Sequence, residues 1–248
     1  MKLVVDAGNS RIRWAEAGSG DLRGHGGEAH DGGARLSELL DRAWSPLPRP
    51  EAVVVANVAG ADFGRRLAGW TADRWGLEPE FVVPGHNAFG VVNAYRTPER
   101  LGADRWAALI AARRRFPGAA CIVDCGTALT VDVLAASGEH LGGIIVPGVR
   151  LMRRALVDGT QGIPDEPDGE VSLLARDTRD AVTGGTLYAA VALIDRVVAD
   201  VADELGPELV PVITGGDAPR VLPLLRNRFR HLPDLVLEGL AVIGGEGS

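Results

Sequence analysis

The sequence predicts a mixed α/β protein built from two related halves, and three observations support this fold class. Apolar segments of strand length alternate with segments of helical periodicity along the 248 residues. An apolar strand that ends in Asp-x-Gly occurs twice, at Asp6 and at Asp124, which are 118 positions apart. Both copies are followed by a second strand. The pattern therefore restarts in the middle of the chain and predicts an internal duplication.

Further pairs support the duplication at the same offset of 118 positions. They are Gly8 with Gly126, Gly20 with Gly138, Asp21 with Glu139, and Gly24 with Gly142. Chance agreement in a chain with 33 glycines is the alternative. The Pro117-Gly118 break lies between the halves, so we expect domains of residues 1–117 and 118–248.

The elements of the first half follow from apolar runs, helical periodicity and proline breaks. Strands are expected at residues 2–6, 12–17, 53–58 and 81–83, with a weak strand inside the glycine-rich segment 18–33. Helices are expected at residues 36–44, 63–75 and 98–115. Prolines 46, 48 and 50 end the first helix, and the last one stops before Pro117.

The second half repeats this order. Strands are expected at residues 121–124, 129–135, 142–146 and 209–213. Helices are expected at residues 149–157, 172–176, 179–204 and 236–243. Each half then contains a strand, a tight turn, two more strands, and further helices and strands.

Composition and charge exclude several classes of protein. With 46% hydrophobic and 24% charged residues, the chain is globular, and its net charge of −7 argues against nucleic-acid or anionic-membrane partners. The longest apolar run, residues 187–198, is interrupted by Asp195 and Arg196, so no membrane span is expected. Asp6 lies where a secretory signal would be apolar, which indicates a cytoplasmic protein.

The lysines, cysteines and sequence motifs of the chain exclude several kinds of catalytic and metal site. Lys2 is the only lysine, so the chain has no Walker A loop and no plausible Schiff-base lysine, and it contains no Gly-x-Ser-x-Gly elbow. Cys121 and Cys125 lie in an apolar strand without nearby histidines, which favours buried free thiols over a zinc site. Loop histidines 25 and 30 are interpreted as solvated side chains.

The two Asp-x-Gly turns suit phosphate binding. Glycine lets the backbone approach an anion, successive N–H groups form a concavity, and a nearby hydroxyl adds a donor. The aspartates would hold Mg²⁺ or another cation, because a carboxylate repels phosphate. One such turn alone would be interpreted as a capped hairpin, but two copies predict a cleft between related halves. A third turn, Thr214-Gly215-Gly216-Asp217, could cover the sugar and base.

A fourth feature is Leu101-Gly102-Ala103-Asp104-Arg105, beside an apolar helix. Adjacent Asp and Arg residues point in different directions on a helix, so they do not form a simple ion pair. One interpretation is a solvated helix face. The functional interpretation is a carboxylate base beside an arginine that binds an anionic substrate group.

Taken in order, these motifs resemble type III pantothenate kinases, which belong to the acetate and sugar kinase/Hsp70/actin superfamily. The resemblance extends over almost the full length. The motifs that carry it are Asp6-Ala7-Gly8-Asn9-Ser10, Asn93-Ala94-Tyr95 with Pro98, Gly102-Ala103-Asp104-Arg105, Asp124-Cys125-Gly126-Thr127-Ala128, Gly142-Gly143 with Pro147-Gly148, Thr178 with Ala181, and Thr214-Gly215-Gly216-Asp217. It implies two duplicated ribonuclease H-like (actin-like ATPase) domains with mixed sheets flanked by helices.

The resemblance also implies a reaction and its residues. The reaction is ATP-dependent phosphorylation of pantothenate to 4'-phosphopantothenate, the first step of coenzyme A biosynthesis. Nucleotide contacts would come from Asp6, Ala7, Gly8, Asn9, Ser10, Arg11, Ile12, Arg13, Gly126, Thr127, Gly215, Gly216 and Asp217. Asp104 would accept the proton, and Tyr95, Gly102, Ala103, Asp104, Arg105 and Thr178 would bind pantothenate.

The resemblance implies cofactors and a partner as well. Asp124 would bind a monovalent cation, K⁺ or NH₄⁺, and Asp6 would reach Mg²⁺ through water. The family is usually homodimeric. The chain departs from the family pattern at Arg13, where lysine is usual. The alternatives are a nucleotide-binding regulatory protein of transcription on the same fold, or a kinase of another small alcohol.

Overall fold

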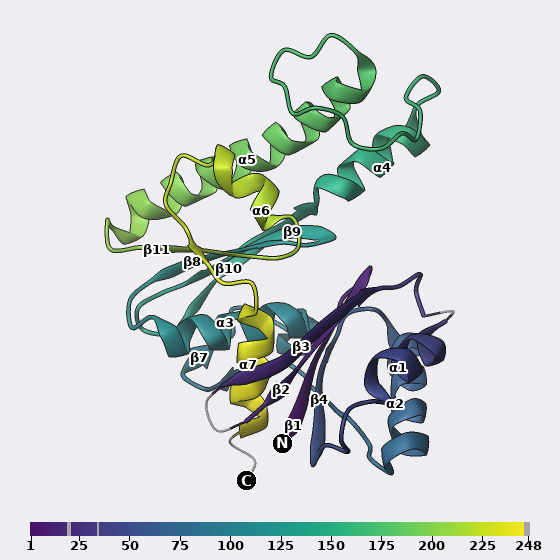
Figure 1. Cartoon of the computed structure of the whole chain (residues 1–248). Coiled ribbons are helices and arrows are strands. Elements are labelled where there is room, and N and C mark those ends of the chain that lie inside the picture. The colour runs from purple at the N-terminus through teal and green to yellow at the C-terminus, as the bar shows by residue number, and fades with distance from the viewer. Residues whose placement is uncertain (19–20, 34, 246–248) are drawn as a thin grey trace. The chain divides into compact units, whose positions relative to one another are not determined.

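The computed structural model describes residues 1–18, 21–33 and 35–245, which form two compact units (Figure 1). Unit 1 contains Met1–Arg115 and the chain from Asp234 onward, and unit 2 is Phe116–Pro233. The first transition lies close to the expected boundary at Pro117-Gly118. The terminal segment differs from the sequence-based division, because its contacts place it in unit 1.

The core of unit 1 is a five-stranded sheet in the order β3-β2-β1-β4-β5. The strands are β1 (Lys2–Ala7), β2 (Arg11–Ala17), β3 (Leu22–Ala29), β4 (Ala52–Asn57) and β5 (Glu80–Phe81). β1, β2 and β3 pair antiparallel, whereas β4 and β5 extend the sheet in parallel with β1. The mixed sheet places the β1–β2 turn and the end of β4 at the same edge.

Helices cover both faces of this sheet. Alternation in β1 sends Leu3 and Val5 into an apolar cluster shared with α1 (Leu36–Trp44) and α2 (Ala61–Trp75). The opposite face is covered by α3 (Ala103–Arg115) and α7 (Leu235–Gly245). These two helices cross closely: a Cβ at Gly239 would lie 1.9 Å from Ala107 O.

Unit 2 repeats the sheet of unit 1, in the order β10-β9-β8-β11-β12 and with the same strand directions. Its strands are β8 (Ala120–Cys125), β9 (Ala128–Leu134), β10 (His140–Pro147), β11 (Val210–Thr214) and β12 (Arg230–His231). The bounds of β8 and β10 are those of β1 and β3 moved by the 118 positions seen in the sequence. The duplicated mixed α/β fold is thus confirmed, although Gly20, one of the matched positions, lies outside the described residues.

The helices of unit 2 are α4 (Val149–Gly159), α5 (Thr178–Leu205) and the short α6 (Ala218–Val221). Leu187 and Ile194 of α5 pack with Cys121 and Val123 of β8 in the core of the unit. By length and composition alone, α5 meets the criteria for a membrane-spanning helix, whereas no such span is expected from the sequence. Its buried sheet-facing side chains show that it serves as the core helix of unit 2.

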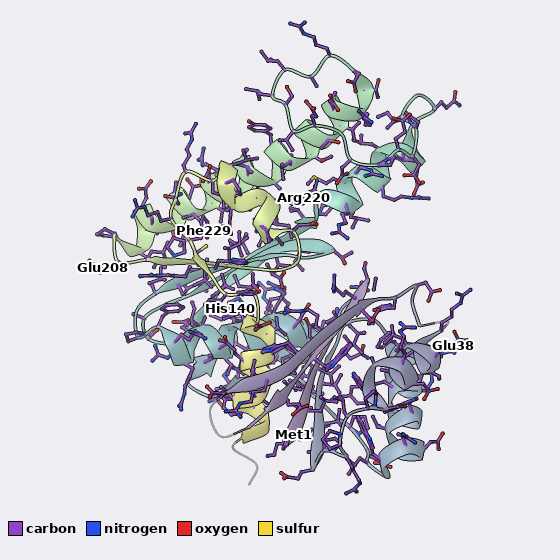
Figure 2. All side chains as sticks on the ribbon, in the orientation of Figure 1. Met1, Glu38, His140, Glu208, Arg220 and Phe229 are labelled. Atoms are coloured by element: carbon purple, nitrogen blue, oxygen red, sulfur yellow. The ribbon has the colours of Figure 1, made fainter. Side chains whose placement is uncertain are left out.

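Most expected elements are confirmed, and two helix predictions are corrected. The helix expected at 98–115 is a short 3-10 turn, Pro98–Arg100, then a break at Leu101 and Gly102 before α3. The helix expected at 172–176 does not form. Small elements that the sequence did not predict are β6 (Asn87–Ala88), β7 (Val91–Val92), β12 and α6. Side chains fill the space between sheet and helices in each unit (Figure 2).

Candidate active site

The first expected phosphate turn joins β1 to β2 in unit 1. Gly8 N–H donates to Arg11 O at 3.0 Å, which closes the turn, and His30 Nε2 lies 2.8 Å from Gly8 O. Asp6, one residue before the end of β1, lies directly opposite Arg13 on β2. The structure therefore places a carboxylate and a guanidinium on neighbouring strands beside a tight backbone turn.

The second turn joins β8 to β9 in unit 2 and is one residue shorter. Gly126 N–H donates to Ala128 O at 3.1 Å, and Gly148 N–H donates to Thr127 O at 2.9 Å. A Cβ at Gly148 would lie 2.3 Å from Gly126 O, so only glycine allows this approach. Helix α4 begins at the next residue, and its N-terminal N–H groups favour an anion beside the turn.

The third turn, at the end of β11, packs on the second one. Gly215 has φ +93°, and a Cβ there would lie 2.4 Å from Asp124 Oδ1. Asp217 N–H donates to Cys125 O at 2.9 Å. Unit 2 therefore brings together the turns that follow β8 and β11, which carry expected nucleotide residues and are far apart in the sequence.

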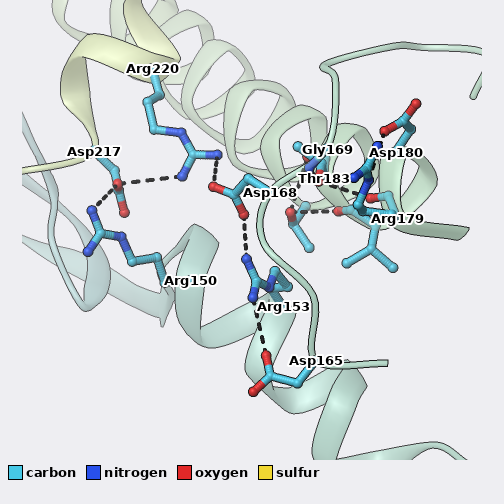
Figure 3. Close-up of polar contacts among 12 residues, drawn as sticks. Arg150, Arg153, Asp165, Asp168, Gly169, Arg179, Asp180, Thr183, Asp217 and Arg220 are labelled. Atoms are coloured by element: carbon cyan, nitrogen blue, oxygen red, sulfur yellow. Dashed lines mark hydrogen bonds and ion pairs between the residues drawn. The ribbon is translucent and has the colours of Figure 1, made fainter. Parts of the chain in front are cut away.

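Asp217 is a buried carboxylate between two arginines (Figure 3). Its Oδ1 lies 3.3 Å from Arg150 Nη2 and 3.8 Å from Arg220 Nη1. Arg220 also pairs with Asp168 at 2.8 Å, and Asp168 pairs with Arg153. These partners could not be predicted from the sequence, because arginine is common throughout the chain and the contacts join α4, α6 and the loop before α5.

The charge of this turn acts on the neighbouring thiol. Burial raises the pKa of Cys125 to about 12, and the carboxylates of Asp124 and Asp217 act in the same direction. Burial, together with Asp132, also raises the pKa of Cys121 to about 12. Both cysteines are free and buried, as the sequence predicts, and neither provides a reactive thiolate at neutral pH.

The expected pantothenate residues of unit 1 lie on a loop organised by Asn93. Its buried side-chain amide donates to Gly85 O at 3.1 Å and to Pro98 O at 3.2 Å, and its Oδ1 accepts the Tyr95 N–H at 3.0 Å. Asn93 is not among the expected site residues, although the Asn93-Ala94-Tyr95 motif contains it. Its role here is to hold the loop that carries Tyr95.

Arg105 reaches this loop from α3. Its Nη1 donates to Tyr95 Oη at 2.7 Å, and its guanidinium carbon lies 5.5 Å from the centre of the Tyr95 ring. Arg105 is only 7% exposed. The interpretation of this segment as a solvated helix face is therefore wrong for Arg105, which is buried against a tyrosine.

Asp104 lies in the first turn of α3 and is partly exposed. Its Oδ1 accepts a hydrogen bond from the backbone N–H of Arg105 at 2.8 Å. A Cβ at Gly102 would lie 2.5 Å from the same oxygen. Gly102 thus leaves room for the carboxylate. Tyr95 and residues 102–105 are grouped in unit 1, whereas Thr178, the first residue of α5, belongs to unit 2.

The described residues contain no group of three or more His, Cys, Asp or Glu side chains that could hold a metal ion. The expected cation ligands, Asp6 and Asp124, are single carboxylates one residue before the ends of β1 and β8. Oxygen donors of this kind suit Mg²⁺ and K⁺ when a nucleotide supplies further oxygens. His25 and His30 instead contact Asp234 and Gly8 of unit 1.

The sequence is similar to one family of known proteins over most of its length. The sequence model of the type III pantothenate kinase family matches residues 2–200. A type III pantothenate kinase of Nitrosococcus oceani is 49% identical over 254 residues, covering 100% of this chain and 95% of the relative. One of Halorhodospira halophila is 39% identical, covering 97% of this chain and 96% of the relative.

Solved structures show the same fold at low identity. A ROK family glucokinase of Streptomyces griseus, solved with glucose and AMPPNP, has a TM-score of 0.56 at 14% identity and covers 99% of each chain. A Campylobacter jejuni protein assigned to the Baf family of transcriptional activators has a TM-score of 0.59 at 18% identity and covers 98% of each chain. The family match and the full-length relatives carry the assignment: the chain belongs to the type III pantothenate kinases, phosphotransferases that use ATP with a divalent metal ion to phosphorylate pantothenate in coenzyme A biosynthesis.

Proposed function

We propose that Asp104 is the proton acceptor when this chain phosphorylates pantothenate to 4'-phosphopantothenate. The observation that carries this proposal is the placement of Asp104 at the start of α3 beside the buried Arg105–Tyr95 pair. The Arg105 N–H bonds one carboxylate oxygen and fixes its orientation. A carboxylate of fixed orientation suits a general base, which must lie within hydrogen-bond reach of the substrate hydroxyl during phosphoryl transfer.

In this proposal pantothenate is bound by Tyr95, Gly102, Ala103, Arg105 and Thr178. Arg105 would donate to the pantothenate carboxylate, for which its planar group offers parallel N–H bonds. Tyr95 supports the guanidinium through its hydroxyl and its ring. The contact with Tyr95 would hold Arg105 ready for the substrate and reduce the entropy lost on binding.

The nucleotide would be held by the three turns. Residues 6–13 and residues 126–127 would contact the phosphates, and residues 215–217 would contact the adenosine. The start of α4 directly after Gly148 supports the phosphate contacts of residues 126–127, because the N-terminal N–H groups of a helix favour an anion. Mg²⁺ would neutralise phosphate charge, with Asp6 reaching it through water.

Further proposals concern the cation, the assembly and the location. Asp124 would bind K⁺ or NH₄⁺, supported by its position against the Gly215 backbone turn. We also propose a cytoplasmic homodimer without nucleic-acid or membrane partners. The net charge of −7 supports the absence of nucleic-acid and anionic-membrane partners.

The test of the base is Asp104→Asn. Asparagine keeps an oxygen for the Arg105 N–H, so the fold should persist, while kcat should fall by roughly 10²–10⁴-fold through loss of the base. The measurement is pantothenate-dependent ADP release with and without K⁺, and Asp73→Asn on the exposed face of α2 serves as the control. Turnover near that of the unmodified enzyme would reject Asp104 as base. The same assay with other alcohols separates the two alternative functions.

A further inference from the structure

Arg13, on the strand that follows the first phosphate turn, has a specific acidic partner in unit 1. Its Nη2 donates to Oδ1 of Asp234, and both side chains are 30% exposed. The other oxygen of Asp234, Oδ2, lies 3.4 Å from His25 Nε2 on β3. The carboxylate is therefore shared between the strand of the first phosphate turn and its neighbour.

Asp234 is fixed at the start of a helix, so its carboxylate can orient a neighbouring side chain. It is the residue at which the chain returns from unit 2 to unit 1, and it directly precedes α7. Its carbonyl accepts the Glu238 N–H at 2.9 Å, which joins it to the first turn of that helix. α7 in turn packs closely on α3 at Gly239. The carboxylate is thus anchored by a helix rather than by a loose loop.

The planar geometry of arginine explains how this contact orients the side chain. A guanidinium has five N–H donors in a rigid plane, so one bond to a carboxylate fixes the direction of the others. A lysine ammonium is a point charge with rotatable donors and gains less from such orientation. Arginine at position 13 therefore benefits from a carboxylate partner in a way that lysine does not.

We propose that Asp234 is a positioning residue that orients the Arg13 guanidinium toward the phosphates of ATP. The inference rests on the proposed contact between Arg13 and ATP. Asp234 repels phosphate, so the proposal requires that the gain from a preoriented guanidinium exceeds this repulsion. The two effects predict opposite changes in ATP affinity when the charge of Asp234 is removed, which makes the proposal decidable.

The experiment uses the unmodified enzyme and six variants. Asp234→Asn should raise KM for ATP about tenfold, as expected for loss of a charge-assisted hydrogen bond, and leave KM for pantothenate unchanged. Asp234→Glu should restore part of the loss. Arg13→Lys should remove the dependence, so adding Asp234→Asn to Arg13→Lys should change KM for ATP less than twofold. Adenosine, which has no phosphate, should bind equally well to the unmodified enzyme and to Asp234→Asn.

The matched control is Glu238→Gln on the same helix. Glu238 pairs with Arg115 through two bonds of 2.6 Å, so its loss should leave KM for ATP unchanged. An unchanged or lowered KM for ATP in Asp234→Asn, or an equal loss in the Arg13→Lys background, would overturn the proposal. Arg13→Ala separates the two levels: if it leaves KM for ATP unchanged, the proposed contact of Arg13 with ATP fails first.

Discussion

Gly215 and Gly216 are adjacent, but the backbone requires glycine at only one of them. Gly215 has φ +93°, and a Cβ would lie 2.4 Å from Asp124 Oδ1 and 2.5 Å from the Cys125 backbone. At Gly216 the space within 4 Å is open. The strand-end turn can therefore approach β8 only because residue 215 has no side chain.

We predict that Gly215→Ala lowers the free energy of unfolding by about 1–3 kcal/mol, because strain at positive φ adds to the steric clash. Gly216→Ala should unfold like the unmodified enzyme. If residues 215–217 bind adenosine, both variants should raise KM for ATP, but only the first should shift urea unfolding. Equal stability of the two variants would contradict the close packing of Gly215 on Asp124.

At Arg105 the shape of the side chain should matter as well as its charge. We predict that Arg105→Lys raises KM for pantothenate by about tenfold or more and changes KM for ATP little, since lysine cannot make the same charge-assisted pair. Tyr95→Phe, which removes the hydroxyl that accepts from Nη1 at 2.7 Å, should show a smaller effect on the same constant. Equal changes in both KM values would assign Arg105 a structural role in α3.

At the scale of elements, β8 carries both cysteines into the core of unit 2. Burial raises the pKa of both thiols from 9 to about 12, so the folded chain retains protons that the unfolded chain releases above pH 9. Stability from the protonated thiols is therefore present below pH 9 and is lost as the pH rises toward 12.

We predict that the free energy of unfolding decreases with pH between about 9 and 11, and that this slope is smaller in a Cys121→Ala/Cys125→Ala variant. Between pH 6 and 8 the two proteins should show the same pH dependence. Urea titrations across both ranges provide the measurement. Identical slopes above pH 9 would mean that the thiols ionise in the folded protein as they do in water.

The sequence predicted most elements because their signals are local. Helix 36–44 is followed by prolines 46, 48 and 50, and its apolar spacing agrees with the observed bounds of α1. Segment 172–176 was misassigned because its contacts are tertiary. Ser172 O lies 2.2 Å from the Cβ position of Gly184, and Gly169 N–H donates to Thr183 Oγ1 at 2.8 Å. The backbone of this segment is therefore held against α5 instead of forming its own helix.

The candidate site shows the same division between local and tertiary signals. The glycine turns and the Asp104-Arg105 pair could be found from residue types and order. The partners of these residues could not: Asp234 meets Arg13 from 221 positions away, and Arg220 meets Asp168 across unit 2. Contacts of this kind depend on how helices pack on the sheets, which no local pattern encodes.

At the scale of the whole molecule, the duplication distributes the proposed nucleotide contacts over both units. Residues 8–11 form the turn of unit 1, and residues 126–128 form the turn of unit 2, each at the end of the first strand of its sheet. Because the same strand–turn–strand element occurs once in each unit, Asp6 and Asp124 have equivalent positions in their sheets. The duplication therefore predicts that ATP affects the turns of both units.

We predict that ATP slows amide hydrogen exchange in both turns and in residues 215–217. A ligand at 100 times its Kd stabilises the bound form by about 2.7 kcal/mol, which corresponds to a slowing of up to about 100-fold for openings that release the ligand. The β9–β10 turn provides an internal control, because Gly138 N–H bonds Ala135 O in the same sheet and lies outside the proposed site. Exchange is measured by mass spectrometry with ATP and with adenosine. Adenosine should protect residues 215–217 and leave residues 8–11 unprotected, since it lacks phosphates. Protection by ATP that is confined to unit 2 would show that the first Asp-x-Gly turn is only a hairpin, and would reject the role of residues 6–13 in binding phosphate.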